Sequence, residues 1–166
     1  MDESGAFQSL AELAIALAGF TSVVVVFGRR GGDFHPADRF RILSALVPSL
    51  SAALLALVPV GLDLAGLSAS TVWRASSLML IAVVGVDGLQ TEVRRSRLPP
   101  ESRAILSPRL RNLFRLLRCL AVLSGLLNAT GVLFAPQAGV YFLAVLLPLV
   151  VGATIFVRTV FVRPAV

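Results

Sequence analysis

The chain has 166 residues, of which 57% are hydrophobic and 14% are charged, and its mean hydropathy is +0.88. About a quarter of the residues of a soluble domain are charged, so this composition excludes a soluble globular protein. Apolar runs of roughly 20 residues recur, the length at which a helix crosses a ~30 Å hydrocarbon core. We therefore predict a single all-α membrane domain over residues 1–166.

The charge balance is basic but does not indicate a nucleic-acid partner. The formal net charge is +6, and every basic residue except His35 is an arginine. The arginines sit at the ends of apolar segments, where positive-inside bias places them, so we expect no nucleic acid to bind. The single cysteine, Cys119, leaves no disulfide within the chain. Asp2 and Glu3 make the start acidic, unlike an export signal, so the first apolar run is expected to remain as a helix.

Five spans follow in chain order, at about residues 6–27, 40–60, 71–90, 113–134 and 140–162. Pro48 and Pro148 fall inside the second and fifth spans, and Pro48 is expected to kink its helix because it removes a backbone hydrogen bond. A loop from Gly61 to Ala69 is expected between the second and third spans. Residues 91–112 form a predicted cytoplasmic arginine-rich loop, within which the fourth helix starts at Pro108.

The distribution of arginine predicts the topology. The stretch from Arg94 to Arg118 holds eight of the fifteen arginines and one acid, Glu101. Arginine-rich and arginine-poor connections alternate without exception along the five spans. Because arginine-rich loops remain in the cytoplasm, we expect the N-terminus outside and the C-terminus in the cytoplasm. A four-span alternative would place an arginine-rich segment outside.

A faint internal repeat accompanies this topology. Residues 39–43 (RFRIL) resemble residues 109–113 (RLRNL), and the pairs 72–73 and 140–141 begin the two return helices. Duplication would give one helix plus two parallel helical hairpins, and parallel repeats occur in transporters. The alternative is that any two hairpins of the same orientation share basic ends and an outer aromatic residue.

Glu12 is the most informative single residue, because it lies inside the first span. A carboxylate at the centre of a membrane helix costs ~2.5–3.5 kcal/mol, so it should face protein or water. It shares a helical face with Ala16 and Gly19, whose small size permits close helix approach. Arg74 opens the third span at a similar expected depth. We expect these two spans to pack and Glu12 to pair with Arg74, either to fix helix register or as a gate or proton-linked site.

Two further polar residues lie inside predicted spans. Asp87 is near the inner end of the third span. Four arginines share its expected depth: Arg41, Arg111, Arg115 and Arg118. The group is either a charge-balanced helix end or a site for a cytoplasmic anion or a permeating ion. Asn128 forms a polar patch with Ser124 and Gly125 and can either join helices or line a pore.

One arginine stripe and two aromatic residues mark the predicted membrane surfaces. Arg111, Arg115 and Arg118 recur at i, i+4 and i+7 on one face of the fourth helix. Such a stripe can contact anionic lipid headgroups at the cytoplasmic face, at ~1 kcal/mol per basic residue, or bind a phosphate ligand or an acidic tail. Trp73 and Tyr141 fall at the outer boundaries and are expected to be interface anchors.

No catalytic or cofactor site is predicted. His35 is the only histidine and lies in a loop, and Cys119 stands alone in an apolar run. No cluster of histidine, cysteine and carboxylate has the spacing of a metal or haem site. The pattern also contains no phosphate-binding loop and no nucleophile–base pair. We therefore expect neither an enzyme nor a bound metal or cofactor.

In the placement of its charged and aromatic residues the chain resembles short bacterial inner-membrane proteins. The resemblance consists of an acid in the first span, arginines that open an outward helix, the segment 73–76 (WRAS) and an aromatic-rich final helix that ends in arginine. It implies a multi-pass protein of the plasma membrane and carries no activity.

Three functional hypotheses follow. The first is a non-enzymatic membrane protein that acts through helix–helix association, as a homo-oligomer or as a subunit of a larger membrane complex. The second is an oligomeric ion channel or small transporter, favoured by the intramembrane polar residues and the mid-helix prolines. The third is a membrane effector or sensor that responds to an anionic ligand or lipid.

Overall fold

The structure is a computed structural model that describes residues 3–27, 36–100, 108–133 and 135–161. Its long helices are α1 (Glu3–Phe27), α2 (Pro36–Leu64), α3 (Ala69–Ser96), α5 (Pro108–Thr130) and α6 (Ala138–Phe161). Each of these five helices is long and apolar enough to cross a membrane. The prediction of an all-α chain with five candidate spans is therefore confirmed.

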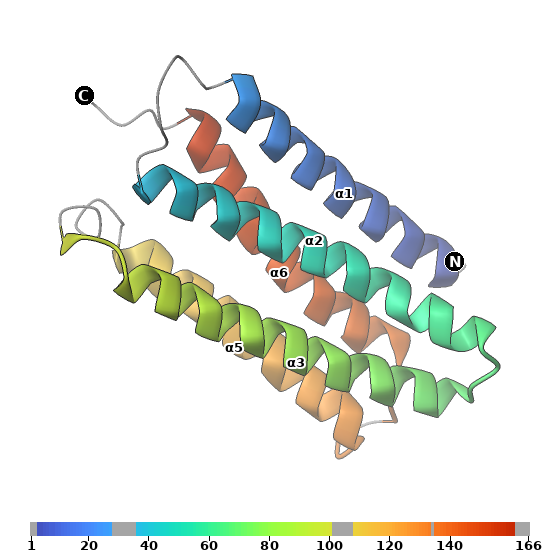
Figure 1. The fold of residues 1–166 in the computed structure, drawn as a ribbon. Helices are drawn as coiled ribbons and strands as arrows, with labels where there is room; N and C mark the ends of the chain where they lie inside the picture. Colours follow the sequence, from blue (N-terminus) through green and yellow to red (C-terminus); the bar gives the residue numbers. More distant parts are fainter. Residues whose placement is uncertain (1–2, 28–35, 101–107, 134, 162–166) are drawn as a thin grey trace.

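The helices form a bundle with α1, α2 and α3 side by side and with α6 and α5 behind them (Figure 1). α2 lies between α1 and α3, and α6 packs against all four other helices. α1 is peripheral, since its extensive contacts are with α2 and, to a smaller extent, α6.

The described arginines other than Arg74 gather at one end of this bundle. Successive helices run in opposite directions, so the starts of α2 and α5 lie at the same end as the last turns of α1, α3 and α6 (Figure 1). We call this the arginine end and the other the opposite end. The arginine end carries Arg94, Arg95, Arg97, Arg109, Arg111, Arg115, Arg118 and Arg158. Arg74 lies near the opposite end, in the second turn of α3. The orientation of this axis in a membrane stays a prediction.

The two predicted hairpins contact each other in an equivalent way. α2 and α5 both start at the arginine end, and α3 and α6 both return to it. α2 packs against α6 as α5 packs against α3. This arrangement is what two parallel hairpins require, while their origin by duplication stays a prediction.

Two connections differ from the predicted loops. α2 continues to Leu64, so the predicted loop from Gly61 is wrong. The turn contains Gly66, whose φ of 78° lies in the left-handed region that a residue without Cβ enters at low cost. α5 ends at Thr130, four residues before the predicted end of the span, and Gly131 follows it with a φ of 68°. A left-handed glycine directly after the last turn is a common helix stop.

The arginine-rich stretch is more helical at its start than predicted. α3 runs to Ser96, so residues 91–96 of the predicted loop belong to a helix, whereas α5 starts at Pro108, as predicted. Arg94 and Arg95 occupy the last turn of α3, where cations interact favourably with the helix dipole. The stretch between the two helices, residues 101–107, lies outside the described residues.

Tyr141 is a core residue, so its predicted role as an interface anchor is wrong. It is fully buried, and its hydroxyl donates a 2.7 Å hydrogen bond to the carbonyl oxygen of Leu55 in α2. That carbonyl has no donor within its own helix, because the residue one turn later is Pro59. The Tyr141 ring also packs against Phe7 and Trp73, which ties α1, α3 and α6 together near the opposite end.

Two glycines allow helices to approach closely. A Cβ at Gly152 of α6 would overlap Ser49 Oγ of α2 and would lie 3.2 Å from the carbonyl oxygen of Ala45. A Cβ at Gly125 of α5 would lie 3.1 Å from a side-chain carbon of Leu80 in α3. In a membrane, where apolar burial does not drive helices together, such close packing is a principal source of association energy.

Candidate functional site

Asp87 of α3 and Arg118 of α5 form a buried ion pair. Arg118 Nη2 lies 2.9 Å from Asp87 Oδ2 and donates a second hydrogen bond of 3.1 Å to Thr91 Oγ1. The Asp87 and Arg118 side chains are only 10% and 13% exposed. The Arg118 side chain lies against Gly88, where a Cβ would be 3.7 Å from its Cδ. Desolvating two charges costs several kcal/mol per ion, so an ionisable pair at this depth is a candidate functional site.

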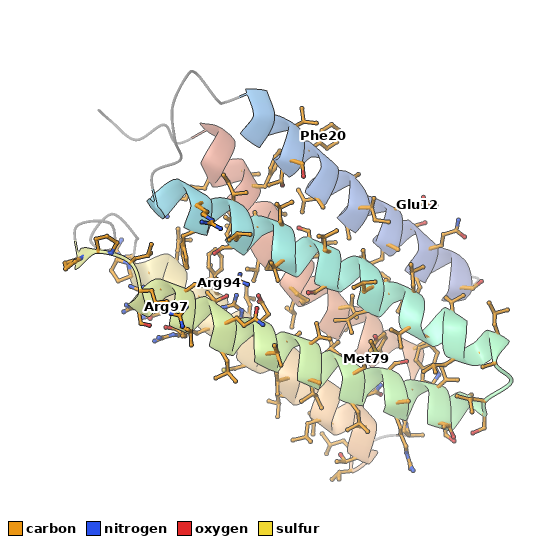
Figure 2. The ribbon with its side chains drawn as sticks, in the orientation of Figure 1. Glu12, Phe20, Met79, Arg94 and Arg97 are labelled. Atoms are coloured by element: carbon orange, nitrogen blue, oxygen red, sulfur yellow. The ribbon has the colours of Figure 1, made fainter. Side chains whose placement is uncertain are left out.

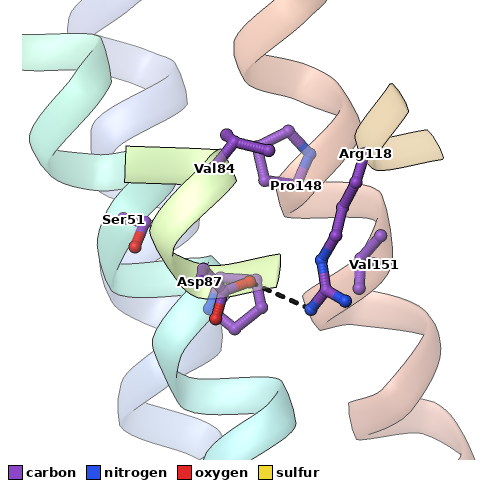
Figure 3. A pocket seen from close by; sticks show the side chains of 7 residues that line it. Ser51, Val84, Asp87, Arg118, Pro148 and Val151 are labelled. Carbon is purple, nitrogen blue, oxygen red and sulfur yellow. Dashed lines mark hydrogen bonds and ion pairs between the residues drawn. The ribbon is translucent and has the colours of Figure 1, made fainter. Parts of the chain in front are cut away.

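The pair lines a small pocket where four helices meet (Figure 3). Its remaining walls are Val84 of α3, Pro48 and Ser51 of α2, and Pro148 and Val151 of α6. The cavity volume is about 10 Å³, which is close to what a single water molecule needs. Pro48 and Pro148 are both mid-helix prolines, so each leaves the carbonyl one turn earlier without its usual donor.

One oxygen of this carboxylate is unsatisfied. Asp87 Oδ1 is buried and has no hydrogen-bond partner among the described residues, whereas Oδ2 accepts from Arg118. An unmade hydrogen bond of a buried polar atom costs ~1–3 kcal/mol, and more for a charged group. One donor molecule in the pocket would remove that cost. The pocket therefore has the chemistry of a small site for a single hydrogen-bond donor.

The predicted arginine stripe faces α3 along most of its length. Arg115 Nε donates a 2.9 Å hydrogen bond to Glu92 Oε1, one turn from the buried pair and half exposed. Arg118 pairs with Asp87, as described above. Arg111 has no ion pair in the described chain, and its Nε atom is buried without a hydrogen-bond partner. Contact of this stripe with anionic lipid stays a prediction.

Glu12 and Arg74 are not brought together, so the predicted pair is wrong within one chain. α1 and α3 pack mainly on α2, and their direct contact is the stacking of Phe7 on Trp73, so the face of α1 that carries Glu12 is turned away from α3. Ser77 and Gly88 of α3 contact α5 instead. Glu12 is exposed and points away from the bundle, where its carboxylate accepts a 3.0 Å hydrogen bond from Gln8 (Figure 2). Ala16 and Gly19 share its helical face, as predicted, but that face is exposed and the predicted packing of α3 on it is wrong within one chain. Arg74 is also exposed and makes no hydrogen bond or ion pair with any described residue.

Asn128 joins helices rather than lining the pocket. It is fully buried, and its Nδ2 donates a 2.9 Å hydrogen bond to Ser77 Oγ of α3. Its Oδ1 accepts a 2.9 Å bond from the backbone N–H of Gln137, in the turn before α6. One amide thus connects α5 to α3 and to the start of α6.

The sequence reasoning missed Glu92 and the partners Thr91 and Ser77. A signal for them exists in the antiparallel register of α3 and α5. Moving ten residues along α3 from Ser77 to Asp87 corresponds to moving ten residues back along α5 from Asn128 to Arg118. Aligning the sequences of the third and fourth helices in antiparallel, with the acids of one opposite the arginines of the other, would have given this register.

Comparison of the chain with family models, with curated proteins and with solved structures found no match. The fold therefore defines the class by itself: a helical protein with five candidate membrane spans and a buried carboxylate–arginine pair.

Proposed function

We propose that this chain is a multi-pass membrane protein that acts through helix association, with a second copy of itself as the partner. The observation that carries the proposal is the position of Glu12 on the outer face of α1. This acid lies inside a candidate span, on the side of the bundle that no other described helix covers. A covering helix would remove the carboxylate from lipid.

The depth of Glu12 in the membrane follows from its position along α1 relative to Phe7, which contacts Trp73. The rings of Phe7 in α1 and Trp73 in α3 stack with a centroid distance of 5.7 Å, so these two residues lie at one level. Tryptophan favours the headgroup region. Glu12 is five residues further along α1, which places it ~7 Å deeper at 1.5 Å per residue. At that depth an unpaired carboxylate costs up to ~3 kcal/mol, which association can recover.

Charge complementarity supports a second copy as the partner. Arg74 is exposed on α3, one residue from Trp73, and makes no hydrogen bond or ion pair with any described residue. A neighbouring α3 against the face formed by Glu12, Ala16 and Gly19 would bring Arg74 and Glu12 to adjacent depths. The small residues of that face let the two backbones approach closely.

The test is the oligomeric state of the purified chain in lipid nanodiscs and mild detergent, with a charge swap. We expect a defined oligomer that Glu12→Arg and Arg74→Glu each weaken and that the double variant restores. Asp63→Asn is the control, since it neutralises an exposed acid near the same end but off α1. A monomer under all conditions would refute the proposal. An oligomer that ignores the swap would refute the contact between Glu12 and Arg74 while leaving association intact.

A second candidate function is the passage of protons or small ions, favoured by the unsatisfied Asp87 oxygen in the pocket between Pro48 and Pro148. The measurement is ion flux in liposomes that contain the purified chain. Asp87→Asn should abolish flux, whereas Glu92→Gln, one turn away and half exposed, should leave it unchanged. Equal flux with and without protein would refute this function.

We also propose that the chain resides in the plasma (inner) membrane with the arginine end in the cytoplasm. Positive-inside bias supports this orientation, because the described arginines of α3 and α5 lie at one end, with Arg74 the exception. Reporter fusions at Gly66 and after Val166 should report opposite sides. Fusions that report the same side would refute the topology.

A further inference from the structure

The arginine end of the α3–α5 pair carries more positive charge than its own acids can neutralise. Beyond the buried pair of Asp87 and Arg118, the described residues of this region contain one acid, Glu92. Six arginines lie at the end of α3 or in the first half of α5: Arg94, Arg95, Arg97, Arg109, Arg111 and Arg115. Figure 2 shows nitrogen-bearing side chains gathered at this end, around the labelled Arg94 and Arg97.

The polar side chains near Arg111 bond to one another and not to Arg111. Arg115 takes the carboxylate of Glu92, and Arg94 donates to Gln90. Arg95 and Arg111 both lie close enough to Glu92 to act on its charge, so one carboxylate serves three guanidinium groups. Arg111 itself makes no hydrogen bond with the described residues, and its Nε is buried without an acceptor.

This arrangement is unfavourable unless something else supplies an acceptor. A buried donor of a charged group that makes no hydrogen bond is costly. The terminal nitrogens of Arg111 are not among the buried unsatisfied atoms, so the end of the side chain is open. A rotation about the side-chain bonds would present Nε together with one terminal nitrogen, the edge that binds two oxygens of one anion in parallel.

We infer that Arg111 is the centre of a binding site for a phosphate group, with the surrounding arginines of α3 and α5 supplying the field. A tetrahedral phosphate offers paired oxygens to the guanidinium edge of Arg111 and negative charge to the arginines around it. A phosphate of this kind is carried by the headgroup of an anionic phospholipid or by a soluble phosphate compound. The site does not depend on the association proposed above, because it uses no residue of α1.

The test measures binding of two probes to the full-length chain in neutral detergent: a short-chain phosphatidylglycerol and inorganic pyrophosphate. Arg111→Gln should lower the affinity by about tenfold or more, the value of a lost bidentate charge-assisted contact. Arg158→Gln is the matched control, since it removes one exposed arginine of the same end from α6. Arg111→Lys keeps the charge but loses the fork, so it should fall between wild type and Arg111→Gln.

The outcomes separate the source of the phosphate from the existence of the site. Loss of lipid binding alone assigns a headgroup site, and loss of binding to both probes assigns a site for the phosphate group itself. Equal losses from Arg111→Gln and Arg158→Gln would overturn the inference, because they would show general attraction to positive charge. Full affinity in Arg111→Lys would also overturn it. Trp73 fluorescence, which reports on packing at the far end, verifies that each variant is folded.

Discussion

The buried pair of Asp87 and Arg118 makes a prediction about stability that its half-exposed neighbour does not share. Arg118→Met keeps a long, unbranched side chain but leaves Asp87 with neither carboxylate oxygen bonded, since Oδ1 already lacks a partner. Asp87→Asn leaves the Arg118 guanidinium without a counter-charge. Removing both charges together leaves no buried ion. We therefore expect the double variant to be more stable than Arg118→Met alone.

The size of the effect follows from burial. With side chains 10% and 13% exposed, this pair belongs to the class in which deleting one partner costs ~3–5 kcal/mol, while replacing both costs little. The control is the Glu92–Arg115 pair on the same two helices, whose side chains are 42% and 51% exposed. Exposed pairs contribute ~0–1 kcal/mol, so Arg115→Met should cost less than ~1 kcal/mol. One turn of helix therefore separates a large effect from a small one.

The assay is reversible unfolding in mixed micelles, followed by the fluorescence of the single tryptophan and by far-ultraviolet circular dichroism. Trp73 packs against Phe7 and Tyr141, so its signal reports on contacts between α1, α3 and α6. If Arg118→Met and Arg115→Met destabilise equally, or if the double variant is the least stable, the pair is not buried as the structure shows and the reasoning fails.

Three further predictions use the same assay. Gly152→Ala should cost ~1–3 kcal/mol through overpacking against Ser49, and Ser49→Ala should recover part of that loss; additive effects would contradict the contact. Asn128→Ala should cost ~1–3 kcal/mol, because it removes one buried and one partly buried hydrogen bond and takes the acceptor from the N–H of Gln137; wild-type stability would contradict this. Tyr141→Phe should cost ~1–2 kcal/mol by removing the hydroxyl that satisfies a proline-freed carbonyl, and a neutral effect would show that this carbonyl has another donor.

The buried polar side chains of the bundle differ in whether each polar atom has a hydrogen-bond partner. Each polar side-chain atom of Asn128 and Tyr141 has one, and the partners are Ser77, Gln137 and Leu55. The role of these two residues is therefore association between helices. Asp87 differs, because one of its oxygens faces no donor among the described residues. This difference is why transport is worth testing at Asp87 and not at Asn128.

The sequence by itself determined the elements. Hydrophobic length predicts a span whatever its neighbours are, because each backbone group in lipid must bond within its own helix. The five spans, the small residues on the face of Glu12 and the gathering of most arginines at one end were all predictable from the sequence. The helix bounds were less predictable. α2 continues through Gly61, and α3 includes residues 91–96. Charged residues are excluded from the hydrocarbon core, but they can still be helical.

Only the tertiary structure decided which helices are neighbours. Lipid and protein are similarly apolar, so a pattern of small and large residues shows that a face is packed without showing what packs on it. The pairing of Glu12 with Arg74 failed for this reason, since α1 packs on α2 and α6 with its other face and leaves Glu12 on the outside of the bundle. Tyr141 was placed at the surface because nothing local shows that Pro59 leaves a carbonyl for it in another helix. Asp87 pairs with Arg118, and not with another arginine, because of the register of α3 against α5. Several contacts between the two helices fix that register together, among them the bond from Asn128 to Ser77.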